Sequence, residues 1–346
     1  QSVNPIQLNQ LKKIRNKKNN MGNKIILMLA RCTQPNLIKT AISKEKTQLL
    51  TIPYSHYCEF GRWSLDANKI PYDHHGYAPG GHVLPTLNLR ICGETKYFAS
   101  SSRVTKVSKD TNIDNNNTED EKKKLLNKDT KKPSKPNPTS VPACVLPDGS
   151  VLPDSWSIAR AFFKSPSYSK QMKKDQEKLV QILDFQLGPQ VRQMFYAVIF
   201  KASNNNLWNK LCTDNSGFIF RTLWNIGFGN LLTKRMIKLF QSDNKYQVDL
   251  CKDKCYECCE RISKEFLPDD ENLYLFGKDK PGMEDYALAS LASGLVCPDL
   301  YCNGDYSNFF DSLLEQDKEY YAFVMKYRKH RVGKFCMMMY EKHRAV

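Results

Sequence analysis

The sequence predicts a small α/β domain followed by an all-α domain, together with two low-complexity appendages. Three observations predict this fold class. Short apolar runs alternate with a helical pattern from Thr47 onward, a Pro-Asp-Gly turn at 147–149 joins two further apolar runs, and every clear hydrophobic period after Lys164 is helical. With 346 residues, of which 41% are hydrophobic, the chain is long enough to bury a sizeable core in two domains.

Residues 1–46 form a basic N-terminal extension or targeting segment that we do not assign to the folded core. They contain ten Lys or Arg residues against one Glu, and they begin without a methionine. Two interpretations stay open. Met21 is the true start, or the segment is a targeting peptide for the mitochondrion or plastid. Without such targeting we expect a cytoplasmic protein.

The α/β part opens with a β-α-β unit. A strand is expected over 47–52, a helix over about 55–68 and a second strand over 70–75. Residues 93–139 have too little apolar surface to offset the entropy of ordering, so they are predicted to be a disordered surface insertion. Two strands at 143–146 and 150–152 follow, and the next helix has Asp154 or Ser155 as its N-cap.

The second half of the chain is predicted to be helical throughout. Helical periods cover residues 169–186, 188–203, 218–241, 245–266, 283–295 and 317–343. We therefore expect an α/β domain over residues 47–165, interrupted by the insertion, and an all-helical domain over residues 169–346.

The net charge of +16 is concentrated in the two appendages. Residues 1–46 contribute +9 and residues 93–139 contribute +4, which leaves only +3 for the presumptive fold. A nucleic-acid-binding protein needs basic and stacking side chains on one folded face, so we expect no nucleic-acid partner. No run approaches the roughly 18 apolar residues of a transmembrane helix, so we expect no membrane span.

Four of the twelve cysteines, Cys251, Cys255, Cys258 and Cys259, lie in the stretch "CKDKCYECC". Metal ligation is one interpretation of this cluster. The spacing is equally that of one buried helix face, and no second ligand pair with zinc-like spacing lies nearby. We favour packing and expect no metal.

Several stretches together resemble the glutathione transferase family. They are "SHYCEFGRWSLD" from Ser55, "YAPGGH" from Tyr77, "LGPQVRQMFYAVI" from Leu187, "LFGKDKPGMEDYALASLAS" from Leu275 and "GKFCMMMYEKHR" from Gly333. The resemblance covers about residues 47–92 and 140–346. It implies a thioredoxin-like glutathione-binding domain with the order β-α-β-α-β-β-α, a helical C-terminal domain, glutathione as a substrate and a homodimer.

The resemblance also implies a cis proline at the start of a strand. Pro85 and Pro142 compete for this position, and Pro142 has the better spacing because it precedes Ser155 by thirteen residues. A cis bond there would turn the backbone of Val141 outward to pair with an extended tripeptide, whereas the alternative is an ordinary trans proline at an edge strand.

The remaining candidate site residues lie at two predicted helix starts. Asp154 and Ser155 suit the γ-glutamyl end of glutathione, because a helix N-terminus offers free N–H groups to a carboxylate; the alternative is a plain N-cap. Ser55 is the candidate for stabilising the glutathione thiolate, as in serine-type members of the family. Cys58 is an alternative catalytic residue, although a packing role is favoured.

The function that follows from the resemblance is the conjugation of glutathione to an unidentified small electrophile, in detoxification or stress. Two alternatives stay open. One is a catalytically silent transferase-like binding or structural protein, and the other is a monothiol glutathione-dependent oxidoreductase that uses Cys58.

Overall fold

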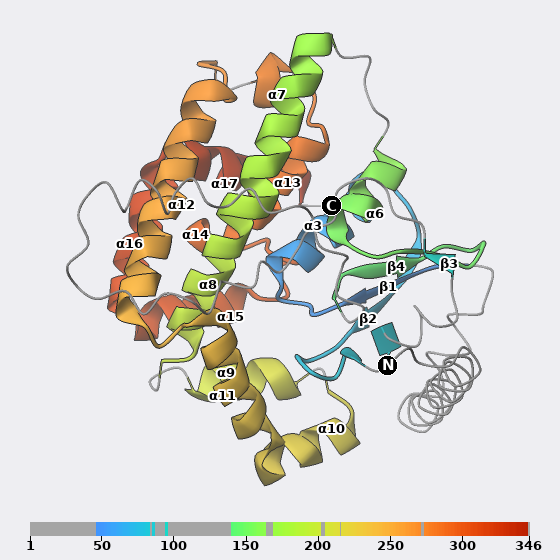
Figure 1. The fold of residues 1–346 in the computed structure, drawn as a ribbon, viewed down its shortest axis with the longest axis vertical. Helices are drawn as coiled ribbons and strands as arrows, with labels where there is room; N and C mark the ends of the chain where they lie inside the picture. The colour runs from blue at the N-terminus through green and yellow to red at the C-terminus, as the bar shows by residue number, and fades with distance from the viewer. Residues whose placement is uncertain are drawn as a thin grey trace, which may run out of the picture.

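The computed structural model describes residues 46–83, 85–86, 94–95, 140–163, 169–201, 205–214, 216–270 and 273–344. Figure 1 shows a small sheet on one side of the molecule and a larger group of helices on the other. The sheet part, with its mixed thioredoxin-like sheet, precedes a helical part in the chain. The predicted fold class is confirmed.

Five strands form one mixed sheet in the order β2-β1-β4-β5-β3. Their bounds are β1 Thr47–Thr51, β2 Tyr72–Gly76, β3 Glu94–Thr95, β4 Ala143–Val145 and β5 Ser150–Leu152. The pairs β1–β2 and β3–β5 are parallel, and the pairs β1–β4 and β4–β5 are antiparallel. The prediction of disorder from residue 93 onward is wrong at Glu94 and Thr95, because their backbone pairs with β5; residues 96–139 lie outside the described part.

Within the described residues, the sheet part contains helices α3 (His56–Ala67) and α6 (Ser155–Phe162). Every residue of α3 from His56 to Leu65 is buried, because α3 packs against α6 on one side and against α13 of the helical part on another. The ring of Phe60 meets Trp156 at 4.8 Å, and the ring of Trp63 meets Tyr286 at 5.2 Å, both edge to face. Helix α3 therefore joins the sheet to the helical part.

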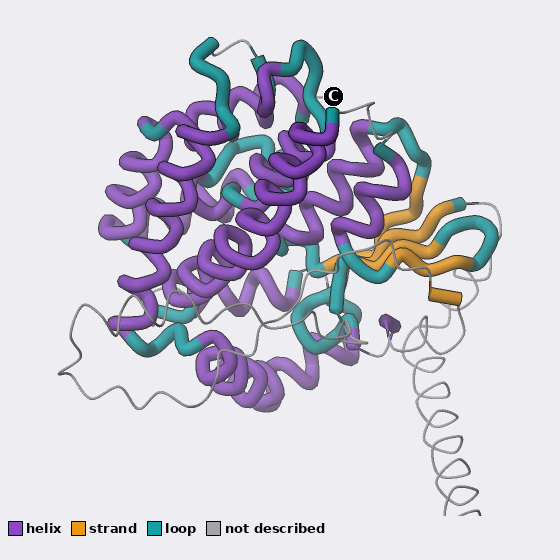
Figure 2. The backbone as a smooth tube through the Cα atoms, turned by 45° about the horizontal axis from the view of Figure 1, so that its top comes forward, coloured by secondary structure: helices purple, strands orange, loops and turns teal. Residues whose placement is uncertain are grey.

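The helical part has the following elements. They are α7 (Lys170–Gln181), η1 (Ile182–Leu187), α8 (Gly188–Ile199), α9 (Asn205–Thr213), α10 (Phe218–Leu223), η3 (Trp224–Phe228), α11 (Gly229–Phe240), α12 (Lys245–Glu265), η4 (Leu275–Gly277), α13 (Met283–Leu291), α14 (Ser293–Val296), α15 (Ser307–Gln316), α16 (Lys318–Lys329) and α17 (Arg331–His343). Figure 2 shows these helices as one mass beside the strands.

The helical prediction differs from the structure at several boundaries. Helices α9 and α15 were not predicted. The predicted helix 218–241 is interrupted at Gly227, whose φ of 118° lies outside helical geometry and favours glycine. The predicted helix 317–343 is divided at His330, whose backbone is extended. The Nδ1 atom of His330 accepts a hydrogen bond from the Val332 amide and caps the start of α17.

The four cysteines of the "CKDKCYECC" stretch lie buried along α12, as the packing interpretation expects. Burial raises the pKa of the Cys258 thiol to about 11 and that of Cys251 to about 12. Among the residues that the structure describes, no group of three or more His, Cys, Asp or Glu side chains is placed to hold a metal ion. Within the same ranges, no helix is both long and apolar enough to cross a membrane.

Candidate functional site

The sheet register brings the predicted site residues to one edge of the sheet. Leu50 of β1 pairs with Ala143 at the start of β4, and Cys144 pairs with Leu152 at the end of β5. The carboxyl end of β1, the amino end of β4 and the carboxyl end of β5 therefore meet. Ser55 follows the first of these ends, Val141–Pro142 precedes the second, and Asp154–Ser155 follow the third.

The peptide bond between Val141 and Pro142 is cis, as predicted. Pro142 packs closely on Gly61 of α3, where an added Cβ atom would lie 3.0 Å from the Cγ atom of Pro142. A larger side chain at position 61 would therefore push α3 away from this edge. The cis bond lies directly before the first residue of β4, beside the end of β1.

Asp154 is the N-cap of α6. Its Oδ1 atom accepts a hydrogen bond of 2.7 Å from the amide of Ser157, and its backbone is extended. The N-cap interpretation of Asp154 is thus correct for its Oδ1 atom. The cap leaves the first N–H groups of α6 directed toward the sheet edge, where a helix N-terminus favours a negative charge.

Three consecutive side chains at this helix start carry buried polar atoms without a partner. Ser155 Oγ, Trp156 Nε1 and Ser157 Oγ make no hydrogen bond within the described part of the chain, and both serines are 0% exposed. A buried polar atom without a partner costs about 1–3 kcal/mol, so such atoms are uncommon in a native fold. Of the three, Ser155 is the first residue of α6 and lies beside the sheet edge, so its hydroxyl is the candidate donor to a polar ligand there.

Ser55 is the N-cap residue of α3, but its side chain makes no capping hydrogen bond. It is only partly buried, unlike the ten residues that follow it. Its hydroxyl and the backbone amide of Ile52 both interact with the Cys58 sulfur. The Ser55 hydroxyl is thus not used for capping, and its partner within α3 is the Cys58 sulfur.

Cys58 lies one helical turn below Ser55 and is 1% exposed. Burial raises the pKa of its thiol to about 12, and the bonds from Ile52 and Ser55, which favour the thiolate, do not offset this. The thiolate is the reactive form of cysteine, and at neutral pH it is scarce here. This environment argues for the packing role of Cys58.

The first turn of α3 is held from the helical part, a feature that the sequence did not reveal. His56 Nε2 lies 3.2 Å from the carbonyl oxygen of Gly188, where α8 begins. The Tyr301 hydroxyl donates to the Tyr54 carbonyl at 2.9 Å, and the Cys302 thiol donates to the Pro53 carbonyl at 3.0 Å. The loop that carries Ser55 is thus fixed on both sides.

The buried position of His56 predicts acid sensitivity. Burial and the nearby charge of Arg192 lower the pKa of His56 to about 3, whereas an unfolded histidine titrates near 6.5. Above pH 6.5 both states are neutral. As the pH falls from 6.5 toward 3, only the unfolded state takes up the proton, so the free energy of unfolding should fall by about 1.4 kcal/mol per pH unit from this group.

A His56→Gln variant should therefore lose this part of the pH dependence. Urea unfolding at pH 7, 6, 5 and 4 measures it: the wild-type curve should fall more steeply below pH 6.5 than the variant curve. Parallel curves for the two proteins would show that folding leaves the pKa of His56 unchanged.

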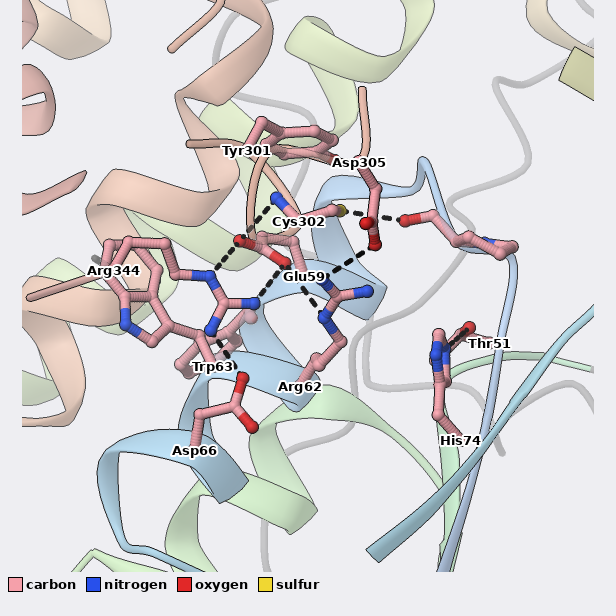
Figure 3. Close-up of polar contacts among 12 residues, drawn as sticks. Thr51, Glu59, Arg62, Trp63, Asp66, His74, Tyr301, Cys302, Asp305 and Arg344 are labelled. Carbon is pink, nitrogen blue, oxygen red and sulfur yellow. Dashed lines mark hydrogen bonds and ion pairs between the residues drawn. The ribbon is translucent and has the colours of Figure 1, made fainter. Parts of the chain in front are cut away.

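A network of buried charges lies along α3 (Figure 3). Glu59 is fully buried and accepts hydrogen bonds from the Cys302 amide at 3.2 Å and from Nη2 of Arg344 at 3.1 Å, and Nε of Arg344 lies 2.9 Å from its Oε1 atom. Arg344 also binds Asp66, and Arg62 lies 3.9 Å from Glu59. The network ties the end of α17 to α3.

Arg192 of α8 places a positive charge beside the same helix start. Its guanidinium lies 5.5 Å from the ring centre of Tyr57 and 5.3 Å from that of Phe240. In the described part of the chain it has no ion-pair partner, and its Nε atom is buried without a hydrogen bond. Together with two helix N-termini, this charge makes the region favourable for an anion.

No protein-family model matches the chain, and no curated protein matches it. The chain is similar to several solved structures. A glutathione S-transferase from Ceriporiopsis subvermispora in complex with glutathione is 13% identical, covers 87% of this chain and 99% of its own, and has a TM-score of 0.47. A glutathione S-transferase from Methylobacillus flagellatus with glutathione bound is 11% identical, with coverages of 84% and 98% and a TM-score of 0.38.

The third structure is a β-etherase from a Sphingobium strain, which is 14% identical, with coverages of 85% and 99% and a TM-score of 0.40. What these proteins bind is a property of those proteins.

Proposed function

We propose that this protein is a glutathione transferase-like enzyme that binds glutathione at the edge of the sheet described above and conjugates it to a small electrophile. One observation carries the proposal. The cis Val141–Pro142 bond, the start of α3 with Ser55 and the start of α6 with the unpartnered Ser155 hydroxyl meet at one edge. Each of these supplies one of the three contacts that an extended γ-glutamyl tripeptide needs.

The proposed roles follow from the chemistry of glutathione. The backbone of Val141 pairs with the backbone of the cysteinyl unit, in the manner of an added strand. The γ-glutamyl carboxylate accepts hydrogen bonds from the Ser155 hydroxyl and from the first amides of α6, while Asp154 faces the ammonium group. The positive charge of Arg192 adds to the attraction for a ligand with two carboxylates.

Ser55 acts on the sulfur in this proposal. Its hydroxyl and the first amides of α3 donate to the glutathione thiolate, which lowers the pKa of the thiol and raises the thiolate fraction at neutral pH. The sulfur lone pair then forms a C–S bond to the electrophilic carbon, and the leaving group departs with the electron pair of the bond that breaks. The electrophile stays unidentified, and detoxification is the role that suits this chemistry.

A second candidate function is a transferase-like protein that no longer turns over substrate. The burial of the first residues of α6 favours this second candidate, because Ser155 is completely buried and Asp154 is 3% exposed. In such a protein, the same edge serves as a binding or structural element. The monothiol oxidoreductase alternative is disfavoured by the burial of Cys58.

Calorimetric titration with glutathione separates the two candidates. Wild-type protein should bind millimolar glutathione, and Ser155→Ala should weaken binding about tenfold, because the variant loses one hydrogen bond to a charged group. Ser263→Ala is the matched control, since Ser263 on α12 also has a buried, unpartnered hydroxyl but lies outside this edge. Absence of any binding heat from the wild-type protein would reject the enzyme and favour the silent scaffold.

We place the glutathione-binding domain at residues 47–165 and the helical domain at residues 169–346, and we expect a homodimer. The expected location is the cytoplasm, with the mitochondrion or plastid as the alternative if the basic segment 1–46 acts as a targeting peptide.

A further inference from the structure

Helices α10 and α11, with η3 between them, expose an unusual amount of apolar surface. Of the nine large hydrophobic side chains that are exposed in the described part of the chain, six lie between residues 218 and 239. They are Phe218, Leu223, Ile226, Phe228, Leu231 and Leu239, which we call the apolar patch. Phe218 is 83% exposed and Ile226 is 75% exposed, so these are not side chains at the margin of the core.

Basic side chains share this surface. On α11 the exposed residues Leu231, Lys234, Arg235, Lys238 and Leu239 follow the spacing i, i+3, i+4, i+7 and i+8, which is one face of a helix. Lys234, Arg235 and Lys238 have no ion-pair partner among the described residues. The sequence from Phe218 to Phe240 contains four basic residues and no Asp or Glu.

The opposite side of these helices is firmly anchored, so their exposed face is part of an ordered structure. Trp224 is 5% exposed and donates from Nε1 to the Asn209 side chain at 3.1 Å, and Trp208 donates to Thr233 at 2.8 Å. Met236 of α11 lies in the main core. Figure 1 shows α9, α10 and α11 at one end of the molecule.

We propose that the exposed face of α10–α11 binds the surface of a membrane that contains anionic lipids. An interfacial helix combines a large apolar face with Lys and Arg residues and few acids, so that the apolar groups enter the acyl boundary while the cations meet lipid headgroups. A protein partner fits less well, because Lys is depleted at protein interfaces and three unpaired cations would be buried there. The long stems of Lys234, Arg235 and Lys238 allow their charged ends to reach the headgroups beside Leu231 and Leu239.

Vesicle co-sedimentation tests this proposal with the full chain. The protein should sediment with phosphatidylcholine vesicles that contain 30 mol% phosphatidylserine and much less with pure phosphatidylcholine vesicles, and 0.5 M NaCl should weaken the binding. The variant Lys234→Glu/Lys238→Glu should weaken binding by at least about fivefold for each basic residue removed. The variant Ile226→Ser/Leu231→Ser should abolish what remains at high salt.

Two surface changes on α16 serve as matched controls. Tyr321→Ser removes an exposed aromatic side chain and Lys329→Glu reverses an exposed charge away from the apolar patch, and both variants should bind vesicles as the wild type does. Equal sedimentation of the wild type and the α10–α11 variants would overturn the proposal. A dimer in size-exclusion chromatography that Ile226→Ser/Leu231→Ser dissociates, without vesicle binding by the wild type, would also overturn it and assign the face to a second copy of the chain.

Discussion

Replacing Glu59 with alanine should lower the free energy of unfolding by about 3–5 kcal/mol. Glu59 is fully buried and is the carboxylate that faces the guanidinium groups of both Arg344 and Arg62. Without it, two largely buried cations lose a counter-charge that solvent does not replace, and the Cys302 amide loses its acceptor. Breaking a buried pair costs far more than the pair itself contributes, because the remaining charge stays desolvated.

Urea unfolding followed by tryptophan fluorescence measures this loss. Glu319→Ala is the matched control, because Glu319 also contacts two cations, Lys201 and Lys252, but lies largely in solvent, where such pairs contribute about 0–1 kcal/mol. The double variant Glu59→Ala/Arg344→Met should recover part of the stability, since it removes the buried cation that would keep only the partly exposed Asp66 as its partner. A loss for Glu59→Ala no larger than for Glu319→Ala would show that water reaches this network.

The same network shows why only part of the molecule was predictable from sequence. Ser55, Pro142 and Ser155 are separated by local elements with clear strand, turn and capping patterns, so the site edge follows from short-range signals once the fold class is known. Arg344 lies 285 residues after Glu59, and no local pattern links them. The spacing of Glu59 and Arg62 did not indicate a buried ion pair either, because charges three residues apart are common on exposed helix faces.

The sequence correctly predicted that the second half of the chain is helical, but it did not predict where the helices are interrupted. Residue Gly227 lies within a continuous apolar period, and only its φ of 118° ends the helix there. His330 is an unusual N-cap, because Ser, Thr, Asp and Asn are the residues that normally mark a helix start. Tyr301 and Cys302 hydrogen-bond the backbone of the Ser55 loop from about 250 residues further along the chain. Such contacts become visible only in the folded chain.

Replacing Ser55 with alanine should lower the rate of the proposed glutathione conjugation at pH 7 by about a hundredfold. A hydrogen bond that lowers the pKa of the glutathione thiol by two units raises its thiolate fraction at neutral pH by about a hundred, which corresponds to about 2.7 kcal/mol. The rate should rise with pH to the same plateau in both proteins. In Ser55→Ala, the midpoint of this rise should lie about two pH units higher. Conversion of 1-chloro-2,4-dinitrobenzene with saturating glutathione, measured from pH 6 to pH 10, records both effects.

Cys58→Ala is the control that separates a direct role of Ser55 from a general disturbance of α3. The Cys58 thiol is neutral at pH 7 because burial raises its pKa to about 12, so its loss removes no nucleophile. It also removes the sulfur with which the Ser55 hydroxyl interacts, which leaves that hydroxyl available to the substrate. The Cys58→Ala variant should therefore keep the wild-type rate and pH profile. Loss of turnover in Cys58→Ala with full activity in Ser55→Ala would reverse the two roles and assign the chemistry to a mixed disulfide at Cys58.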